Sequence, residues 1–196
     1  MDKNKKDEHQ YVTLSKVYTK RGDKGETDLL GGSKARKDSL KVDSYGCVDE
    51  ASAFIGVARF YSKNRIIKER LKEIQNKLLV LGGYLASDDS GKDMLKDQIS
   101  EDDVKKLEDF IDEYNQKLEP LFQFILPGDD EVAAHFHVAR TVVRRAERKI
   151  VSLTREENLN PLVQKYVNRL SDLMFVLARY SEEVESKKWG SSTLNI

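Results

Sequence analysis

The sequence lacks several features that would place it in a common class of protein. Cys47 is the only cysteine among 196 residues, so no intramolecular disulfide can form, and no second cysteine or paired histidine stands at zinc-ligand spacing. This fits a reducing compartment, and we expect a cytoplasmic protein. Net charge is also lacking, because 34 basic residues balance 34 acidic ones. We therefore expect neither nucleic acid nor a membrane as a partner.

Long apolar runs are missing as well. No stretch approaches the roughly 20 apolar residues that a membrane-spanning helix needs. Residues 1–10 mix lysine with aspartate and glutamate and contain no apolar core, which argues against a signal peptide or a transit peptide. We expect a disordered tail at 1–12 and a single domain at 13–196, because a chain of this length can bury one good-sized core.

Strand patterns are nearly absent, apart from short runs at 12–18 and 124–126, and helical periodicity dominates after residue 40. The pair Gly82 and Gly83 lies inside the clearest helix, at about 66–87, and we interpret it as a place where another backbone packs closely. Six apolar residues share one face of this helix: Ile67, Leu71, Ile74, Leu78, Leu81 and Leu85.

Four further patterns predict helices at about 42–62, 100–118, 132–153 and 160–184. Ser100 is a candidate N-cap followed by acidic residues, and Pro161 occupies the first position of the last helix, where proline is favoured. Five antiparallel helices with short connections form a bundle. The predicted fold class is therefore all-α, a five-helix antiparallel bundle preceded by a glycine-containing N-terminal segment.

The segment 18–27 combines glycines, hydroxyls and charges. Gly22 and Gly25 allow positive φ and let backbone amides approach an anion, as in a polyphosphate cradle. It is not a Walker loop, because the G-x-x-x-x-G-K-[ST] pattern occurs nowhere in the chain, and no G-x-G-x-x-G follows a strand pattern. A solvated turn is the alternative interpretation. Further donors and positive charge come from Thr19, Lys20, Lys24 and Thr27.

A polar stripe accompanies the apolar face of the 132–153 helix. His137, Arg140, Arg144 and Glu147 are spaced three, four and three residues apart, so they share one side. The arginines suit phosphate, and Glu147 suits an arginine or the shell of a magnesium ion. The alternatives are a solvated face with internal ion pairs and a nucleic-acid patch. His135 and His137 point about 200° apart, so we interpret them as structural, satisfied histidines rather than metal ligands.

Two smaller features remain. Asn168 and Asp172 are four residues apart on the last helix and share a face, with Ser171 beside them. Phe122 and Phe124 precede Pro127 and Gly128 in a loop, where they contact a flat ligand or form a satellite of the core.

Five segments in order resemble the PduO-type cob(I)alamin adenosyltransferases. The resemblance implies a homotrimer of five-helix bundles with ATP held between adjacent subunits. It implies transfer of the 5′-deoxyadenosyl group of ATP to Co(I) of a corrinoid, with release of triphosphate and formation of adenosylcobalamin. The implied partners are a corrinoid reductase and a B12-dependent enzyme that receives the product. The segments cover most of the chain: 17–27, 44–50, 124–128, 139–148 and 168–173.

The resemblance also implies a set of site residues. Phe124, Arg144 and Asn168 would take part in the catalytic step, with Phe124 displacing the lower axial ligand of the corrinoid so that cobalt becomes four-coordinate and easier to reduce. The residues implied around ATP are Thr19, Gly22, Lys24, Gly25, Thr27, Lys37, Arg144, Glu147 and Asn168.

Three further implications concern the surroundings of the nucleotide. Magnesium would be held through the ATP phosphates near Glu147, and Asp49 would pair with Arg140 across the subunit boundary. Asp129 departs from the family pattern, which usually has a second glycine at this position beside the corrinoid.

Two alternatives of other classes stay open. A corrinoid carrier would keep the binding residues without releasing triphosphate, and a purely structural helical bundle would explain the apolar faces but not the 18–27 segment. The sequence shows no Ser/His/Asp or Cys/His constellation, which is awkward for a hydrolase. Attack by cobalt needs no general base, because the cofactor supplies the nucleophile.

Overall fold

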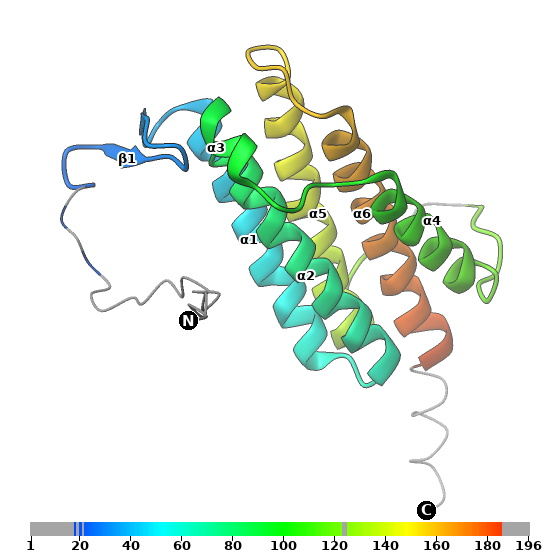
Figure 1. The fold of residues 1–196 in the computed structure, drawn as a ribbon. Coiled ribbons are helices and arrows are strands. Elements are labelled where there is room, and N and C mark those ends of the chain that lie inside the picture. The colour runs from blue at the N-terminus through cyan, green and yellow to red at the C-terminus, as the bar shows by residue number, and fades with distance from the viewer. Residues whose placement is uncertain (1–17, 19, 21, 123–124, 186–196) are drawn as a thin grey trace, which may run out of the picture.

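The computed structural model of the 196-residue chain describes residues 18, 20, 22–122 and 125–185. The tail predicted at 1–12, together with Thr19 and Phe124, lies outside these residues. Within them, five long helices alternate in direction and form a bundle, so the predicted all-α fold is confirmed (Figure 1). The helices are α1 (Leu40–Tyr61), α2 (Arg65–Leu85), α4 (Glu101–Asn115), α5 (Glu131–Leu153) and α6 (Pro161–Tyr180).

The helices pack in a simple order. α1 lies against α2 and α5, α6 packs on α5, and α4 packs on α6 (Figure 1). The π-helical turn η1 (Ser181–Glu185) continues α6 and contacts α5. A short helix, α3 (Asp89–Met94), follows α2 and was not predicted, because six residues are too few to show a helical period.

The predicted apolar faces form the core. All six periodic residues of α2 are buried, and the most exposed of them, Ile74, is only 3% exposed. The predicted faces of the other helices are buried as well. Four predicted residues lie at the margin of the core and are partly exposed: Ile111, Leu118, Val132 and Val184. The hydrophobic effect acting on these faces therefore accounts for the arrangement of the bundle.

The helices begin where side chains satisfy their first amides. Ser100 accepts a hydrogen bond from the amide of Asp103, whose carboxylate accepts one from the amide of Ser100, which completes a capping box. Pro161 is the first residue of α6, as the sequence predicted, and the Asn160 side chain caps the helix by accepting from the amide of Leu162. α4 ends at Asn115, three residues earlier than expected, and continues as turns.

A two-stranded hairpin precedes the bundle and was not predicted. β1 (Glu26–Asp28) and β2 (Lys34–Arg36) pair antiparallel, with Thr27 opposite Ala35. Three-residue strands are too short for an alternating pattern to be read from sequence. Of the predicted strand runs, 12–17 lies outside the described residues, and residues 125–126 form an irregular loop.

The interpretation of the glycine pair in α2 is wrong for the described chain. A Cβ atom built on Gly82 or Gly83 would meet nothing within 4 Å, so no other backbone lies close to them. The helix continues through both glycines.

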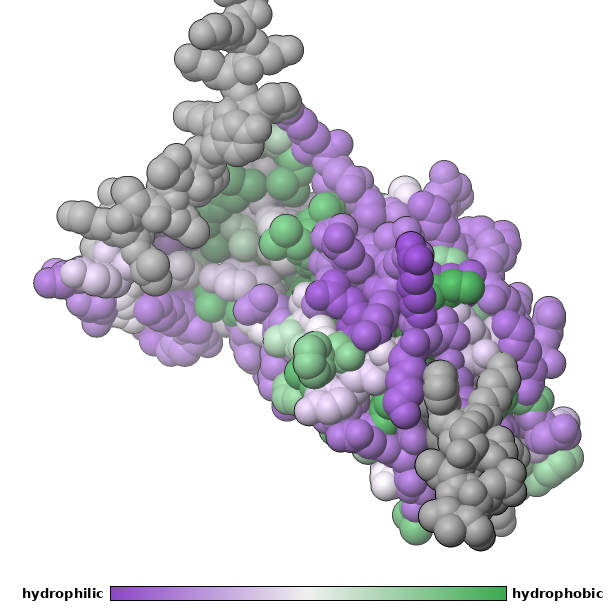
Figure 2. Space-filling model, turned by 90° about the horizontal axis from the view of Figure 1, so that it is seen from below, coloured by the Kyte–Doolittle hydropathy of each residue, from purple (hydrophilic) through white to green (hydrophobic). Residues whose placement is uncertain are grey.

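The surface agrees with the composition. Among the described helices, none is long and apolar enough to cross a membrane. The face in Figure 2 is mostly hydrophilic, and hydrophobic side chains appear on it in small groups.

Candidate functional site

The N-terminal segment forms an open cavity of about 1100 Å³. Its described lining comes entirely from residues 18–37 and includes Gly22 and Thr27 of the predicted site. Four lysines and three carboxylates line it, which leaves one positive charge in excess. The lysines are Lys20, Lys24, Lys34 and Lys37.

The two glycines of this segment shape a turn that brings Lys37 back onto it. Gly25 has a φ of +80°, and its amide donates to the carbonyl of Gly22 at 3.2 Å. The amide of Lys37 donates to the carbonyl of Gly25 at 2.8 Å. A Cβ on Gly22 would lie 2.8 Å from the Lys37 ammonium nitrogen. Glycine at position 22 therefore leaves room for the Lys37 side chain, and the structure brings together three residues that the sequence predicted as one site.

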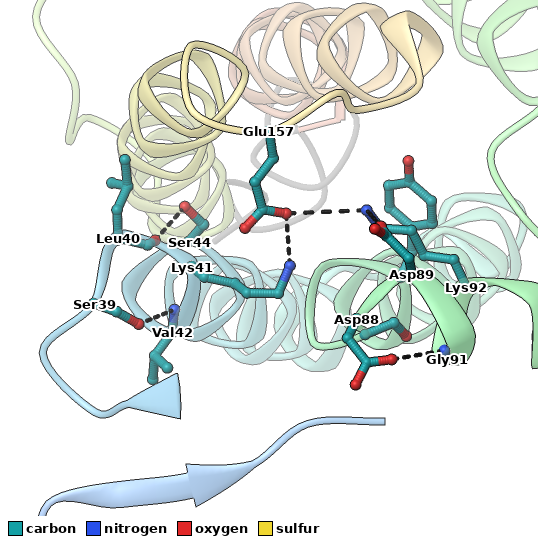
Figure 3. A network of polar contacts seen from close by, with 12 residues as sticks. Ser39, Leu40, Lys41, Val42, Ser44, Asp88, Asp89, Gly91, Lys92 and Glu157 are labelled. Atoms are coloured by element: carbon teal, nitrogen blue, oxygen red, sulfur yellow. Dashed lines mark hydrogen bonds and ion pairs between the residues drawn. The ribbon is translucent and has the colours of Figure 1, made fainter. Parts of the chain in front are cut away.

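The turn of the hairpin is clamped onto the junction between α2 and α3. The amide of Leu30 donates to the carbonyl of Ala86, and the amide of Asp88 donates to the carbonyl of Leu30, both at 2.9 Å. The Asp88 carboxylate accepts from the amides of Ser33 at 3.0 Å and Gly91 at 2.9 Å (Figure 3). These contacts hold the cavity-forming segment at a defined place on the bundle.

The clamp is tightly packed and favours an ionised Asp88. Hydrogen bonds from Ser33, Gly91 and Ser90 hold the pKa of Asp88 well below its usual range. A Cβ on Gly31, whose φ is +109°, would lie 1.7 Å from an oxygen of Asp88, and one on Gly91 would lie 1.9 Å from the carbonyl oxygen of Leu30. Asp88 was not predicted as a site residue, and only its N-cap position before a short helix is a sequence signal for it.

A second polar network stands behind the clamp. Lys41, near the start of α1, donates to Glu157 in the α5–α6 connection at 2.7 Å, and Lys92 of α3 lies 4.0 Å from the same carboxylate oxygen (Figure 3). The Lys41 side chain is only 11% exposed. Glu157 therefore links three separate parts of the chain at the end of the bundle that bears the hairpin.

The basic residues of α5 divide into two groups. Arg145 forms an ion pair with Glu50, and Lys149 forms one with Asp43 at 2.6 Å, so both are paired within the chain. Arg140 and Arg144 form no ion pair with any described residue. The Arg140 guanidinium instead lies 5.9 Å from the ring centre of Phe175, and burial, then the charge of Arg144, lowers its pKa. The stripe thus presents positive charge without an internal acidic partner.

Glu147 and Asn168 meet between α5 and α6. The Asn168 amide nitrogen donates to a Glu147 oxygen at 2.9 Å. Arg144 stands one turn before Glu147 on the same side of α5, so the structure places these three predicted residues on one surface. Asp172 lies one turn further along α6, and partial burial raises its pKa while Arg169 opposes that shift.

The two histidines diverge as predicted. His135 stacks on Tyr61 of α1, with ring centres 4.4 Å apart, whereas the ring centre of His137 lies 6.1 Å from that of Phe175 on α6. The expectation that His137 is satisfied is wrong for the described part of the chain, because the ring is buried and neither ring nitrogen has a hydrogen-bond partner there. Burial, then the charge of Arg140, lowers its pKa, so it is held neutral.

The described residues of the loop before α5 are mostly exposed. Phe122 is 91% exposed, which argues against a role in a satellite core. Gly128 has a φ of +129° and is followed by Asp129, whose charge adds to the effect of burial in raising the pKa of Glu182 in η1. The departure at Asp129 thus places a carboxylate near another acidic group.

Among the described residues, the cavity and the stripe do not meet within one chain, because no residue of α5 or α6 lines the cavity. The hairpin projects sideways from the bundle near α3 (Figure 1), whereas Arg144, Glu147 and Asn168 lie on α5 and α6. Each set has an excess of donors and positive charge without the other. Such surfaces on a helical scaffold indicate a protein that binds a polyanionic ligand.

Comparison with known proteins identifies the family. The family described as cobalamin adenosyltransferase matches residues 17–181. The chain is 40% identical over 169 residues to the corrinoid adenosyltransferase of Citrobacter freundii. The aligned region covers 86% of this chain and 96% of the relative. The chain is 43% identical over 168 residues to that of Bacillus subtilis, covering 84% and 85%.

A solved structure agrees with these relatives. A variant of the PduO-type ATP:corrinoid adenosyltransferase of Lactobacillus reuteri, complexed with cobalamin and ATP, matches with a TM-score of 0.81 and 38% identity over 87% of this chain and 96% of the other. The chain therefore belongs to the cobalamin adenosyltransferase family, as the order of its motifs predicted.

Proposed function

We infer that this protein is an ATP:corrinoid adenosyltransferase, which transfers the 5′-deoxyadenosyl group of ATP to Co(I) of cob(I)alamin and releases inorganic triphosphate. The observation that supports this best is the match to the family over residues 17–181, together with the lysine-lined cavity and Arg144, which has no ion-pair partner in the described part of the chain. The cationic surfaces suit the triphosphate that must be bound and released.

The reaction is a substitution at carbon. An electron pair on Co(I) forms the cobalt–carbon bond to C5′, while the bond from C5′ to oxygen breaks and its electron pair leaves with triphosphate. Because the substrate supplies the nucleophile, the protein needs no general base. Its contributions are to align C5′ with cobalt, to neutralise the leaving charge and to exclude water.

Residues from both surfaces share the task of binding ATP. We assign Lys37 and Arg144 to the charge that grows on the leaving triphosphate. Lys37 lies over the glycine turn, and Arg144 forms no ion pair with the residues that the structure describes. Asn168 and Glu147 complete the surface beside Arg144. The remaining proposed ATP contacts lie in the N-terminal segment and are Thr19, Gly22, Lys24, Gly25 and Thr27.

The described residues fit a magnesium ion that arrives with the nucleotide. Among them, no group of three or more histidine, cysteine, aspartate and glutamate side chains can hold a metal ion. Magnesium is commonly held by one or two carboxylates and substrate phosphates, and Glu147 can supply one carboxylate oxygen while the other accepts from Asn168. When bound, the ion would offset phosphate charge.

We propose that the assembly is a homotrimer whose ATP sites lie between subunits. The separation of the cavity from the stripe supports this, because one chain leaves each set incomplete. Asp49 is exposed on α1, and Arg140 of α5 forms no ion pair within residues 22–122 and 125–185, so the two are available to pair across the boundary.

Other assignments rest on the resemblance to the family. Phe124 is proposed to displace the lower axial ligand of the corrinoid, and the exposed Phe122 shows that this loop can present aromatic side chains. A corrinoid reductase that supplies the electron, a B12-dependent enzyme that receives the product, and a cytoplasmic location stay predictions.

An anaerobic assay tests the activity. Purified protein is mixed with chemically reduced cob(I)alamin, ATP and Mg²⁺, and the loss of Co(I) absorbance is followed while adenosylcobalamin and triphosphate are quantified. We expect the two products in equal amounts. Binding of ATP and corrinoid without either product would favour the carrier function, and no ATP-dependent thermal shift would favour a structural role.

A further inference from the structure

Asn168 is held in one orientation by two neighbours of opposite chemistry. Its amide oxygen accepts a hydrogen bond from Arg169 at 2.7 Å, and its amide nitrogen donates to Glu147 at 2.9 Å. A guanidinium can only donate and a carboxylate can only accept, so the opposite orientation would face both neighbours with the wrong group. The amide nitrogen therefore keeps one N–H that points to neither neighbour and is available to a ligand.

The contact between Asn168 and Arg169 needs a cause outside α6. Adjacent residues of a helix point about 100° apart and do not normally face each other. Arg169 reaches back because its Nε donates to Glu108 of α4 at 2.9 Å, which leaves Nη1 directed at Asn168. Asp172 lies 3.9 Å from the same Nη1, too far to replace Glu108 as the acceptor of a hydrogen bond from Arg169.

We propose that Glu108 of α4 is a positioning residue for the nucleotide site. Glu108 holds Arg169, Arg169 holds the amide oxygen of Asn168, and Asn168 thereby presents an N–H donor to an acceptor atom of bound ATP. This inference rests on the proposed function and extends its site to α4, a helix with no other role there. Charge reversal at Glu108 would repel Arg169 and release the Asn168 amide.

The chain offers a matched control on the same helix. Glu113 of α4 also bridges to an arginine of a neighbouring helix, Arg70 of α2, at 2.6 Å. The Glu108 and Glu113 side chains are 41% and 42% exposed. Glu113 also pairs with Lys117 at 3.4 Å, so Glu113→Lys removes at least as much ion pairing as Glu108→Lys. Only Glu108→Lys touches the chain of contacts that leads to Asn168.

The experiment measures ATP binding by calorimetry and, in the adenosyl-transfer assay, the KM values for ATP and cob(I)alamin together with kcat. We expect Glu108→Lys to weaken ATP binding and raise the KM for ATP by about fivefold, the size of one weakened hydrogen bond. The KM for cob(I)alamin should stay within about twofold. Glu108→Gln should give a smaller change in the same direction, and Glu113→Lys should leave ATP binding unchanged at a similar thermal midpoint.

A double-mutant cycle separates positioning from a general loss of structure. If Glu108 acts through Asn168, Glu108→Lys should have no further effect on ATP binding in an Asn168→Ala background. Additive effects, or an equal loss in Glu113→Lys, would overturn the inference alone. A wild-type protein that fails to bind ATP would overturn the proposed function as well, so the two failures are distinguishable.

Discussion

The hairpin segment and the α5–α6 surface position the residues proposed to bind ATP in different ways. The hairpin lies outside the core and is fixed by backbone hydrogen bonds and one carboxylate, Asp88. Arg144 and Asn168 lie on α5 and α6, whose inner faces are buried in the core. Phe136 of α5 and Leu170 of α6, for example, are 0% exposed. A ligand residue on the hairpin therefore depends on a few local contacts, whereas one on the helices depends on the whole core.

The largest effect is expected on the helical side. Arg144→Ala should lower kcat/KM for adenosyl transfer by about 100-fold, because a preorganised cation for the leaving triphosphate is lost while the core stays intact. Lys149→Ala removes a neighbouring cation of α5 that is paired with Asp43, and it should change kcat/KM by less than about twofold. Anaerobic turnover assays compare the two, and full activity of Arg144→Ala would contradict our assignment.

A mixing experiment tests whether the two regions act across subunits. Lys37→Ala and Arg144→Ala should each be nearly inactive alone. Co-expression should restore about one quarter of the sites. In random assembly, about half of the subunits that supply Lys37 carry it intact, and about half of their neighbours carry an intact Arg144. No recovery in co-purified hybrid oligomers would place both residues in one chain's site.

Weakening the clamp should affect the hairpin more than the bundle. Asp88→Asn should raise the KM for ATP by about fivefold, with little change in thermal midpoint, because it removes a charged acceptor from the turn. Gly91→Ala should raise the KM further, since its Cβ would strike the carbonyl of Leu30. Gly82→Ala places the same methyl group in open space and serves as the control. An equal loss of thermal stability and ATP affinity in Asp88→Asn would argue against a local clamp.

The clamp also has a defined pH dependence. The pKa of Asp88 is lowered in the folded protein, so its stabilising contribution is fully present above the unfolded value of about 3.9. It is lost as pH falls below that value towards the folded pKa. Asp88 therefore stays ionised between pH 8 and pH 5. Over this range the pH dependence of ATP affinity should be the same in the wild type and in Asp88→Asn.

The smallest effect is expected in the second polar network, around Glu157. Glu157→Gln should lower the free energy of unfolding by about 1 kcal/mol, because a half-buried carboxylate shared by Lys41 and Lys92 loses its charge. The thermal midpoint should fall by about 2–4 °C, with the KM for ATP nearly unchanged. A change in the KM as large as that of Asp88→Asn would show that the two networks are not separate.

Much of the site could be predicted because its residues lie close together in the sequence or repeat with the helix. Arg144 and Glu147 share a side of α5 through their spacing alone, and Gly22 and Gly25 belong to one turn. Asp88 and Glu108 could not be predicted, since neither stands in a recognisable motif. Arg140 and Arg145 also look alike in sequence, and only the position of Glu50 on α1 separates a paired arginine from an unpaired one.

The sequence by itself determined the five helices, their buried faces and the family, because helical periodicity and short ordered motifs are local properties of the chain. Only the tertiary structure decided how the site residues are held. Ser33 and Asp88 are 55 residues apart, and Glu108 and Arg169 are 61 apart. Contacts of that kind depend on how elements pack, so the clamp and the orientation of Asn168 appear only once the bundle is assembled.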